Sequence, residues 1–119
     1  MNSTKILVEK IVEGIQEKKG HDIKVVDLSN IEDTVCRAFV ICTGNSPTQV
    51  QAITDSIEET VRKAIGQKPT ATDGLRHAMW VAMDYTDVIV HIFLPETRDF
   101  YDIEHLWADA EIVSYEEAI

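Results

Sequence analysis

The sequence predicts a single domain of the α/β class, more narrowly α+β, with one mixed β-sheet packed by helices in the order αββαββα. Two segments carry apolar residues at helical spacing, and four short segments are rich in β-branched and other apolar residues. The chain has 119 residues, 45% apolar and 27% charged, which suits one globular core. We therefore expect a folded domain over residues 1–107 and an acidic tail over residues 108–119.

The first helix is expected over residues 4–19, where Leu7, Ile11 and Ile15 form one stripe and Gly20 follows as a stop signal. Two strands then follow. Residues 23–28 are rich in β-branched side chains, and residues 38–43, AFVICT, form a continuous apolar run. Such a run is typical of a strand that is covered on both faces.

The second helix has the clearest start signal in the chain. Ser46 can cap the helix, Pro47 suits the first helical position, and the side chain of Gln49 can reach back to complete a capping box. Apolar residues recur at steps of three and four up to Gly66, which is expected to end the helix. A loop through Gly74 should follow.

Two apolar segments on either side of Tyr85 and Thr86 are typical of a β-hairpin. A turn at these two residues predicts three pairs on the core side of the sheet, namely Met83–Val88, Val81–Val90 and Met79–Ile92. It predicts three pairs on the opposite side, namely Ala82–Ile89, Trp80–His91 and Ala78–Phe93. That second side is apolar and aromatic, so it lies under a helix or receives a partner.

The same hairpin places Asp84 opposite Asp87. Like charges in such positions destabilise a hairpin unless a positive group neutralises them, so this rim is a candidate functional site. Trp80 suits either core packing or an interface anchor, and its position beside the rim favours the interface.

The last helix is expected to begin at Pro95. Its aromatic residues Phe100, Tyr101 and Trp107 are interpreted as helix packing. Residues 112–115 could add an edge strand within an otherwise loosely held tail.

Catalytic and ligand-binding interpretations are weaker than structural ones. Metal-dependent phosphoryl transfer requires two carboxylates on the same face of one strand, and Asp84 and Asp87 do not supply such a pair. His91 and His105 have no serine or cysteine nucleophile nearby in the sequence, so structural roles are favoured over general-base catalysis. The loop at residues 44–46 could bind an anion, but capping by Ser46 explains it better. We expect no cofactor, no metal and no enzymatic activity.

The net charge of the chain limits the classes of partner that it can bind. The formal net charge is −10, which repels phosphate backbones and attracts basic proteins, so direct sequence-specific nucleic-acid binding is not expected. Cys36 and Cys42 are the two cysteines, and a disulfide between them is not expected. The sequence has no signal-peptide, transit-peptide or membrane-spanning pattern. We therefore expect a cytoplasmic protein.

Four stretches resemble the ribosomal silencing factors, RsfS, also called the Iojap or YbeB family. They are AFVICTGNSPTQVQAI, the Asp73–Gly74 loop, WVAMDYTDVIVHIF and PETRDFYDIEHLW. The resemblance covers about Ile23 to Trp107, and its last two stretches are highly specific.

The resemblance implies a nucleotidyltransferase-like fold without the active site. It also implies binding to the large ribosomal subunit through ribosomal protein fourteen, which blocks association with the small subunit and represses translation. The family's partner-facing positions match Trp80, Asp84, Tyr85 and Asp87. His91 is added as a candidate partner-binding residue because it shares the sheet face of Trp80.

The family usually has glycine where this chain has Thr86, so the turn geometry there is in question. Family members also often form homodimers. Two alternatives remain open beside silencing: a factor that assists assembly of the large subunit, and an enzyme related to the nucleotidyltransferases.

Overall fold

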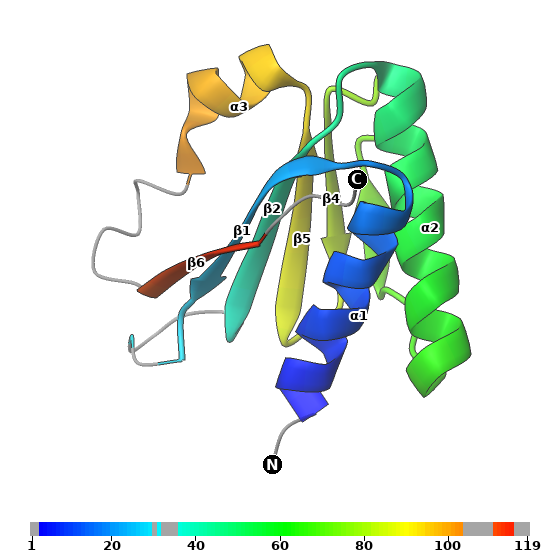
Figure 1. Cartoon of the computed structure of the whole chain (residues 1–119), viewed down its shortest axis with the longest axis vertical. Helices are drawn as coiled ribbons and strands as arrows, with labels where there is room; N and C mark the ends of the chain where they lie inside the picture. Colours follow the sequence, from blue (N-terminus) through cyan, green and yellow to red (C-terminus); the bar gives the residue numbers. More distant parts are fainter. Residues whose placement is uncertain (1–2, 30, 32–35, 104–110, 116–119) are drawn as a thin grey trace.

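The computed structural model describes residues 3–29, 31, 36–103 and 111–115, and Figure 1 shows their arrangement. The elements are α1 (Ser3–Glu17), β1 (His21–Asp27), β2 (Ala38–Thr43), α2 (Pro47–Ile65), β3 (Ala71–Asp73), β4 (Trp80–Asp84), β5 (Val88–Phe93), α3 (Pro95–Tyr101) and β6 (Glu111–Tyr115). The predicted helices and strands are therefore present. The short strand β3 was not predicted, and β6 is the edge strand that the sequence suggested.

The strands form one six-stranded mixed sheet in the order β3-β4-β5-β2-β1-β6. The central pair, β2 and β5, is parallel, and each of the other neighbouring pairs is antiparallel. Strand β2 is almost completely buried, as its apolar run predicted. Because β6 pairs with β1, residues 111–115 belong to the sheet and not to a separate tail. The predicted boundary at residue 107 lies outside the described residues.

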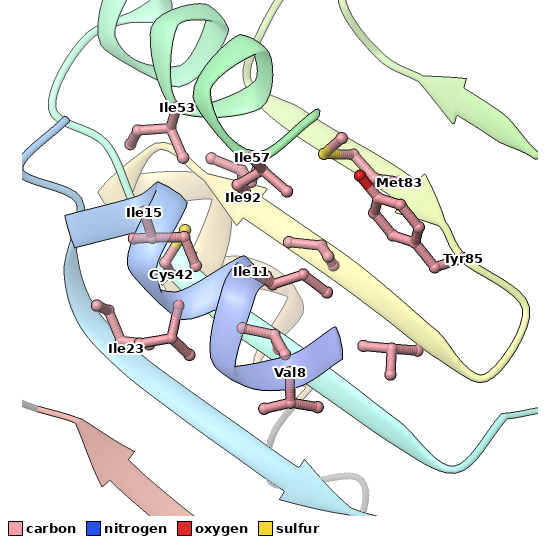
Figure 2. Close-up of a cluster of buried hydrophobic side chains, with 14 of the residues drawn as sticks. Val8, Ile11, Ile15, Ile23, Cys42, Ile53, Ile57, Met83, Tyr85 and Ile92 are labelled. Carbon is pink, nitrogen blue, oxygen red and sulfur yellow. The ribbon is translucent and has the colours of Figure 1, made fainter. Parts of the chain in front are cut away.

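Helices α1 and α2 pack side by side against one face of the sheet (Figure 1). Their apolar stripes meet alternate residues of the strands, and Figure 2 shows part of this main core around Ile11, Ile57 and Ile92. The two helices come very close at Gly14, where an added Cβ would lie 2.8 Å from the Cα of Ile57. A residue larger than glycine would therefore separate the helices and open the core.

The ends of α2 largely follow the prediction. Ser46 Oγ accepts a hydrogen bond from the backbone N–H of Gln49 at 3.1 Å, and Gly66 ends the helix with a left-handed φ of 69°. The capping box differs in one partner, because Gln49 Oε1 accepts from the backbone N–H of Asn45 at 2.7 Å. The side chain of Gln49 therefore reaches one residue further back than predicted.

The β4–β5 hairpin forms, but the predicted pairing is wrong by two residues. Met83 pairs with Val90, and Asp84 pairs with Ile89. The turn lies one residue later than predicted, at Thr86 and Asp87, since the N–H of Tyr85 donates to the carbonyl of Val88 across these two residues. A shift of two residues keeps every side chain on its predicted face, so the division into a core face and an opposite face within the strands is correct.

Strand β4 begins at Trp80, two residues later than predicted, because Ala78 has a positive φ of 52° that interrupts the extended backbone. Met79 consequently leaves the predicted core side and is 50% exposed. Gly74 has a φ of 94°, and a Cβ there would lie 2.0 Å from the carbonyl oxygen of Trp80. Glycine at this position therefore lets the loop pass directly over the start of β4.

Helix α3 ends at Tyr101 because Asp102, the next residue, takes a left-handed conformation. The observed helix is therefore shorter than the predicted one. Trp107 and His105 lie outside the described residues. Both cysteines are buried and neither is in a disulfide, and burial raises the pKa of Cys42 to about 12. Among the described helices, none has the length and apolar character that crossing a membrane requires.

Candidate protein-interaction surface

The sheet face opposite α1 and α2 carries the residues that the sequence singled out. Alternation along β4 and β5 places Trp80, Asp84, His91 and Phe93 on this face. A second, smaller apolar cluster lies here, with Phe93 buried and Phe39 and Trp80 partly exposed. Helix α3 packs against β5 on this side, at the end of the sheet where Trp80 lies.

Trp80 is half-buried and fixed by three neighbours. Its ring lies 5.0 Å from that of Phe93 and 4.6 Å from that of Tyr101, measured between centroids. Its Nε1–H donates to Nδ1 of His91 at 3.0 Å. The indole is therefore held in one orientation by packing and by a directional hydrogen bond, with part of its surface still exposed.

His91 is 8% exposed and acts as a structural histidine, as the sequence favoured. Because Nδ1 accepts from Trp80, the proton of the neutral ring is assigned to Nε2. Nε2 has no hydrogen-bond partner among the described residues, and the ring meets Phe39 edge-on at 5.0 Å. Burial lowers the pKa of His91 to about 4, so the ring is neutral at pH 7 and positions Trp80.

Beside Trp80, apolar side chains are exposed that the sequence had assigned to packing. Met79 is 50% exposed, Phe100 81% and Tyr101 47%. Phe100 therefore does not pack into the domain as predicted. With neighbouring residues they form a groove of about 500 Å³, lined by Gly74, His77, Met79, Trp80, Glu96, Thr97, Phe100 and Tyr101. Exposed aromatic residues gathered in this way are typical of a binding surface.

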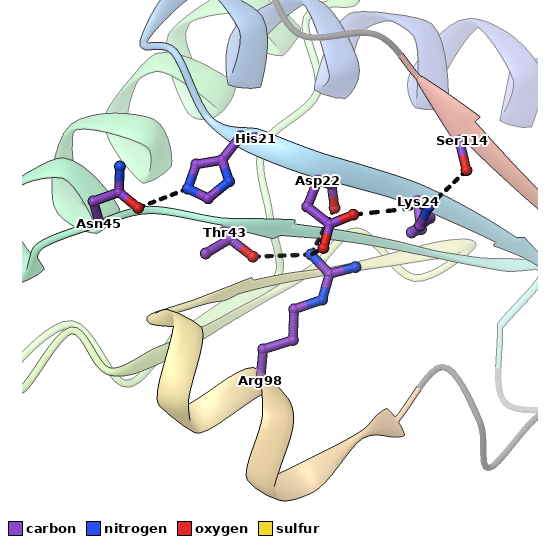
Figure 3. Close-up of polar contacts among 7 residues, drawn as sticks. All are labelled: His21, Asp22, Lys24, Thr43, Asn45, Arg98 and Ser114. Carbon is purple, nitrogen blue, oxygen red and sulfur yellow. Dashed lines mark hydrogen bonds and ion pairs between the residues drawn. The ribbon is translucent and has the colours of Figure 1, made fainter.

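Arg98 holds α3 against the end of the sheet, and Figure 3 shows its contacts. Its Nη1 donates to the carbonyl oxygen of Asp22 at 2.6 Å and to Thr43 Oγ1 at 2.9 Å, and it lies 3.5 Å from Asp22 Oδ2. The guanidinium group is therefore buried with hydrogen-bond partners on β1 and β2. This anchor fixes the helix that carries Phe100 and Tyr101, and no pattern of residues in the sequence indicated it.

The two aspartates of the predicted rim at the hairpin turn lie apart from each other in the structure. Asp84 is half-buried on the face of Trp80, and its Oδ1 accepts from the backbone N–H of Thr86 at 2.7 Å. Asp87 does not lie opposite it, because Asp84 pairs with Ile89. The Oδ2 of Asp87 instead lies 3.5 Å from Thr4 Oγ1 at the start of α1. The two carboxylates therefore do not form the repulsive pair that the sequence predicted.

Tyr85 differs most from its predicted place at the surface. It is 1% exposed and belongs to the main core beside Met83, on the helix-covered side of the sheet (Figure 2). In this conformation its ring is not available to a partner. Its hydroxyl has no hydrogen-bond partner among the described residues.

Within the described part of the chain, no group of three or more His, Cys, Asp or Glu residues has the arrangement of a metal site. The candidate anion loop is also occupied by internal contacts, since Asn45 Oδ1 lies 2.7 Å from His21 Nε2 and Ser46 caps α2. The most distinctive surface is therefore the aromatic one around Trp80.

A small α+β domain that presents fixed, exposed aromatic side chains beside carboxylates has the features of a protein-binding domain. The chain belongs to the ribosomal silencing factor family, because the family model described as "Ribosomal silencing factor during starvation" matches residues 1–118. Membership implies a ribosome-associated role in regulating translation.

Individual relatives support this membership. Ribosomal silencing factor RsfS of Halalkalibacterium halodurans is 32% identical over 117 residues, covering 98% of each chain. A crystal structure of a Chromobacterium violaceum protein superposes with a TM-score of 0.82 at 33% identity, covering 87% of this chain and 85% of the other. A more distant relative is "Mitochondrial assembly of ribosomal large subunit protein 1" of Mus musculus, 25% identical over 84% of this chain and 44% of that protein.

Proposed function

We propose that this protein binds the large ribosomal subunit in the cytoplasm through ribosomal protein fourteen, prevents the small subunit from joining, and so represses translation. The observation that carries the proposal is the exposed aromatic surface formed by Met79, Trp80, Phe100 and Tyr101. Buried aromatic anchors dominate the binding energy of protein interfaces, and this surface offers them already oriented.

Charge complementarity supports a basic protein partner. The net charge of −10 attracts a ribosomal protein set in RNA and repels bare RNA. Glu96 lines the groove beside Trp80, and Asp84 lies on the same sheet face at the other end of β4, so both can meet cations of that partner. Asp87 lies by α1, so it contributes to the long-range field and not to the same contact.

Steric blocking follows from the size of the domain. Its extents are 36 × 33 × 28 Å. An interface of standard size buries about 800 Å² on each partner, which leaves most of the domain projecting from the subunit. A body of this thickness on the intersubunit surface cannot be accommodated in a joined ribosome.

The test is sucrose-gradient sedimentation of large subunits incubated first with excess protein and then with small subunits. Phe100→Ala is the most informative variant, because a side chain that is 81% exposed can be removed without opening the core. Trp80→Ala should weaken binding by about 2 to 4 kcal/mol. It also removes packing against Phe93, so its stability must be measured beside its binding. Ile65→Ala, on the helix-covered side and 38% exposed, is the matched control.

The protein should hold subunits apart, Phe100→Ala and Trp80→Ala should restore joining, and Ile65→Ala should behave as the unaltered protein. Joined ribosomes that form normally while the protein stays on the large subunit would refute the blocking mechanism. That result would favour the second candidate, a role in assembly, which the name of the mouse relative supports.

A further inference from the structure

The groove beside Trp80 combines aromatic rings with a carboxylate. Phe100 and Tyr101 lie 5.0 Å apart with their planes at 88°, and the Tyr101 ring lies 4.6 Å from that of Trp80. The rings therefore present faces and edges in different directions around the groove. Glu96, from the first turn of α3, lines the same groove.

Two features of this lining favour a cation. The faces of aromatic rings carry negative potential and attract ammonium and guanidinium groups. Glu96 is exposed and forms no ion pair with another described residue, so its carboxylate is available to a ligand. An acidic occupant would be repelled by this carboxylate and by the net charge of −10.

We propose that this groove binds an arginine side chain of the protein partner. The planar guanidinium group stacks on Phe100 or Tyr101 and donates hydrogen bonds to Glu96, while its methylene groups lie against Met79. A purely apolar side chain would fill the groove but would bring no partner for the Glu96 carboxylate. The inference deepens the proposed function, since it names the chemistry by which the same surface recognises a basic protein.

The groove can be tested without ribosomes. Two probes, N-acetyl-arginine amide and N-acetyl-norleucine amide, are titrated into the folded protein while NMR follows the indole N–H of Trp80. The arginine probe should bind more tightly than the norleucine probe. Phe100→Leu keeps an apolar side chain but removes the ring face, and should weaken arginine binding by about two- to fivefold. Glu96→Gln should weaken it by a similar factor, whereas the control Glu58→Gln, on α2, should leave it unchanged.

Equal or tighter binding of norleucine would overturn the proposal, as would full arginine binding by Phe100→Leu. Measuring the same variants on purified large subunits separates this inference from the proposed function. Variants that lose the arginine probe but bind subunits normally would remove the groove from partner recognition and leave silencing intact. An unaltered protein that binds the arginine probe but no subunit would refute the proposed function and leave the groove as a cation site.

Discussion

Replacing Arg98 by methionine tests whether this one side chain holds α3 in place. Methionine keeps an apolar stem but removes the guanidinium hydrogen bonds to the Asp22 carbonyl and to Thr43 Oγ1. Hydrogen bonds to a charged group contribute about 1.5 to 3 kcal/mol each. The ion pair with the Asp22 carboxylate adds little, because that side chain is 55% exposed and screened by water.

The free energy of unfolding should therefore fall by about 2 to 4 kcal/mol, since water can replace part of the lost bonding at the Asp22 carbonyl. Urea denaturation followed by circular dichroism measures this change, with Arg62→Met as the control, because Arg62 is exposed on α2. A loss below about 0.5 kcal/mol, within the range of ordinary surface substitutions, would refute the anchoring role of Arg98. Near-ultraviolet circular dichroism should also change, because α3 carries the Tyr101 ring that packs on Trp80.

Two further predictions concern the hairpin and its histidine. Thr86 has a φ of 74°, which is strained for a β-branched residue, so Thr86→Gly should raise the free energy of unfolding by about 1 kcal/mol in a thermal melt. A lower stability would mean that the Thr86 side chain makes up for the strain. The pKa of His91 is about 4 in the folded protein against 6.5 for an ordinary histidine, so the unfolded chain takes up a proton first as the pH falls. Stability should be fully present above pH 6.5 and drop by roughly 3 kcal/mol towards pH 4, and His91→Gln should lose this part of the pH dependence.

Much of the fold could be predicted from local patterns. Three elements could be predicted because the residues within each one determine it: α1 has an apolar stripe that becomes buried, β2 has an apolar run that becomes buried, and α2 begins at the hydrogen-bonding cap Ser46. Strand β3 could not be predicted in the same way. It has three residues, two of them exposed, and forms because β4 offers a free edge for pairing.

The hairpin shows where such reasoning fails. Side-chain alternation assigns each residue to a face, but it is unchanged by a shift of two, so the pairing depended on the turn chosen. The predicted turn placed Tyr85 at the surface. In the structure the turn lies one residue later, at Thr86 and Asp87, so Tyr85 continues the core-facing alternation of Val81 and Met83 and its ring is buried.

The candidate site was predicted in part. The placement of Trp80 and His91 on the face away from the helices was predicted correctly, because alternation along the strands puts both there, while their role in binding stays a prediction. Met79 and Phe100 were missed, since their exposure depends on Ala78 interrupting the strand and on Arg98 setting the position of α3. The Arg98 contacts join segments far apart in the sequence, which a local pattern does not contain. The positive φ of Ala78 is local, but alanine rarely adopts it, so nothing in the pattern of residues indicates it.

The parallel pairing of β2 with β5 has a consequence for the synthesis of the protein. Each residue of β2 pairs with one roughly fifty positions later, as Ala38 does with Val88, so the centre of the sheet closes a long loop. While β5 is still inside the ribosomal exit tunnel, β2 lacks its parallel partner at the centre of the sheet, and the apolar surfaces of α1 and α2 that pack against β5 stay exposed. The nascent chain therefore cannot complete its core until Phe93 has emerged, and until then it depends on protection from aggregation.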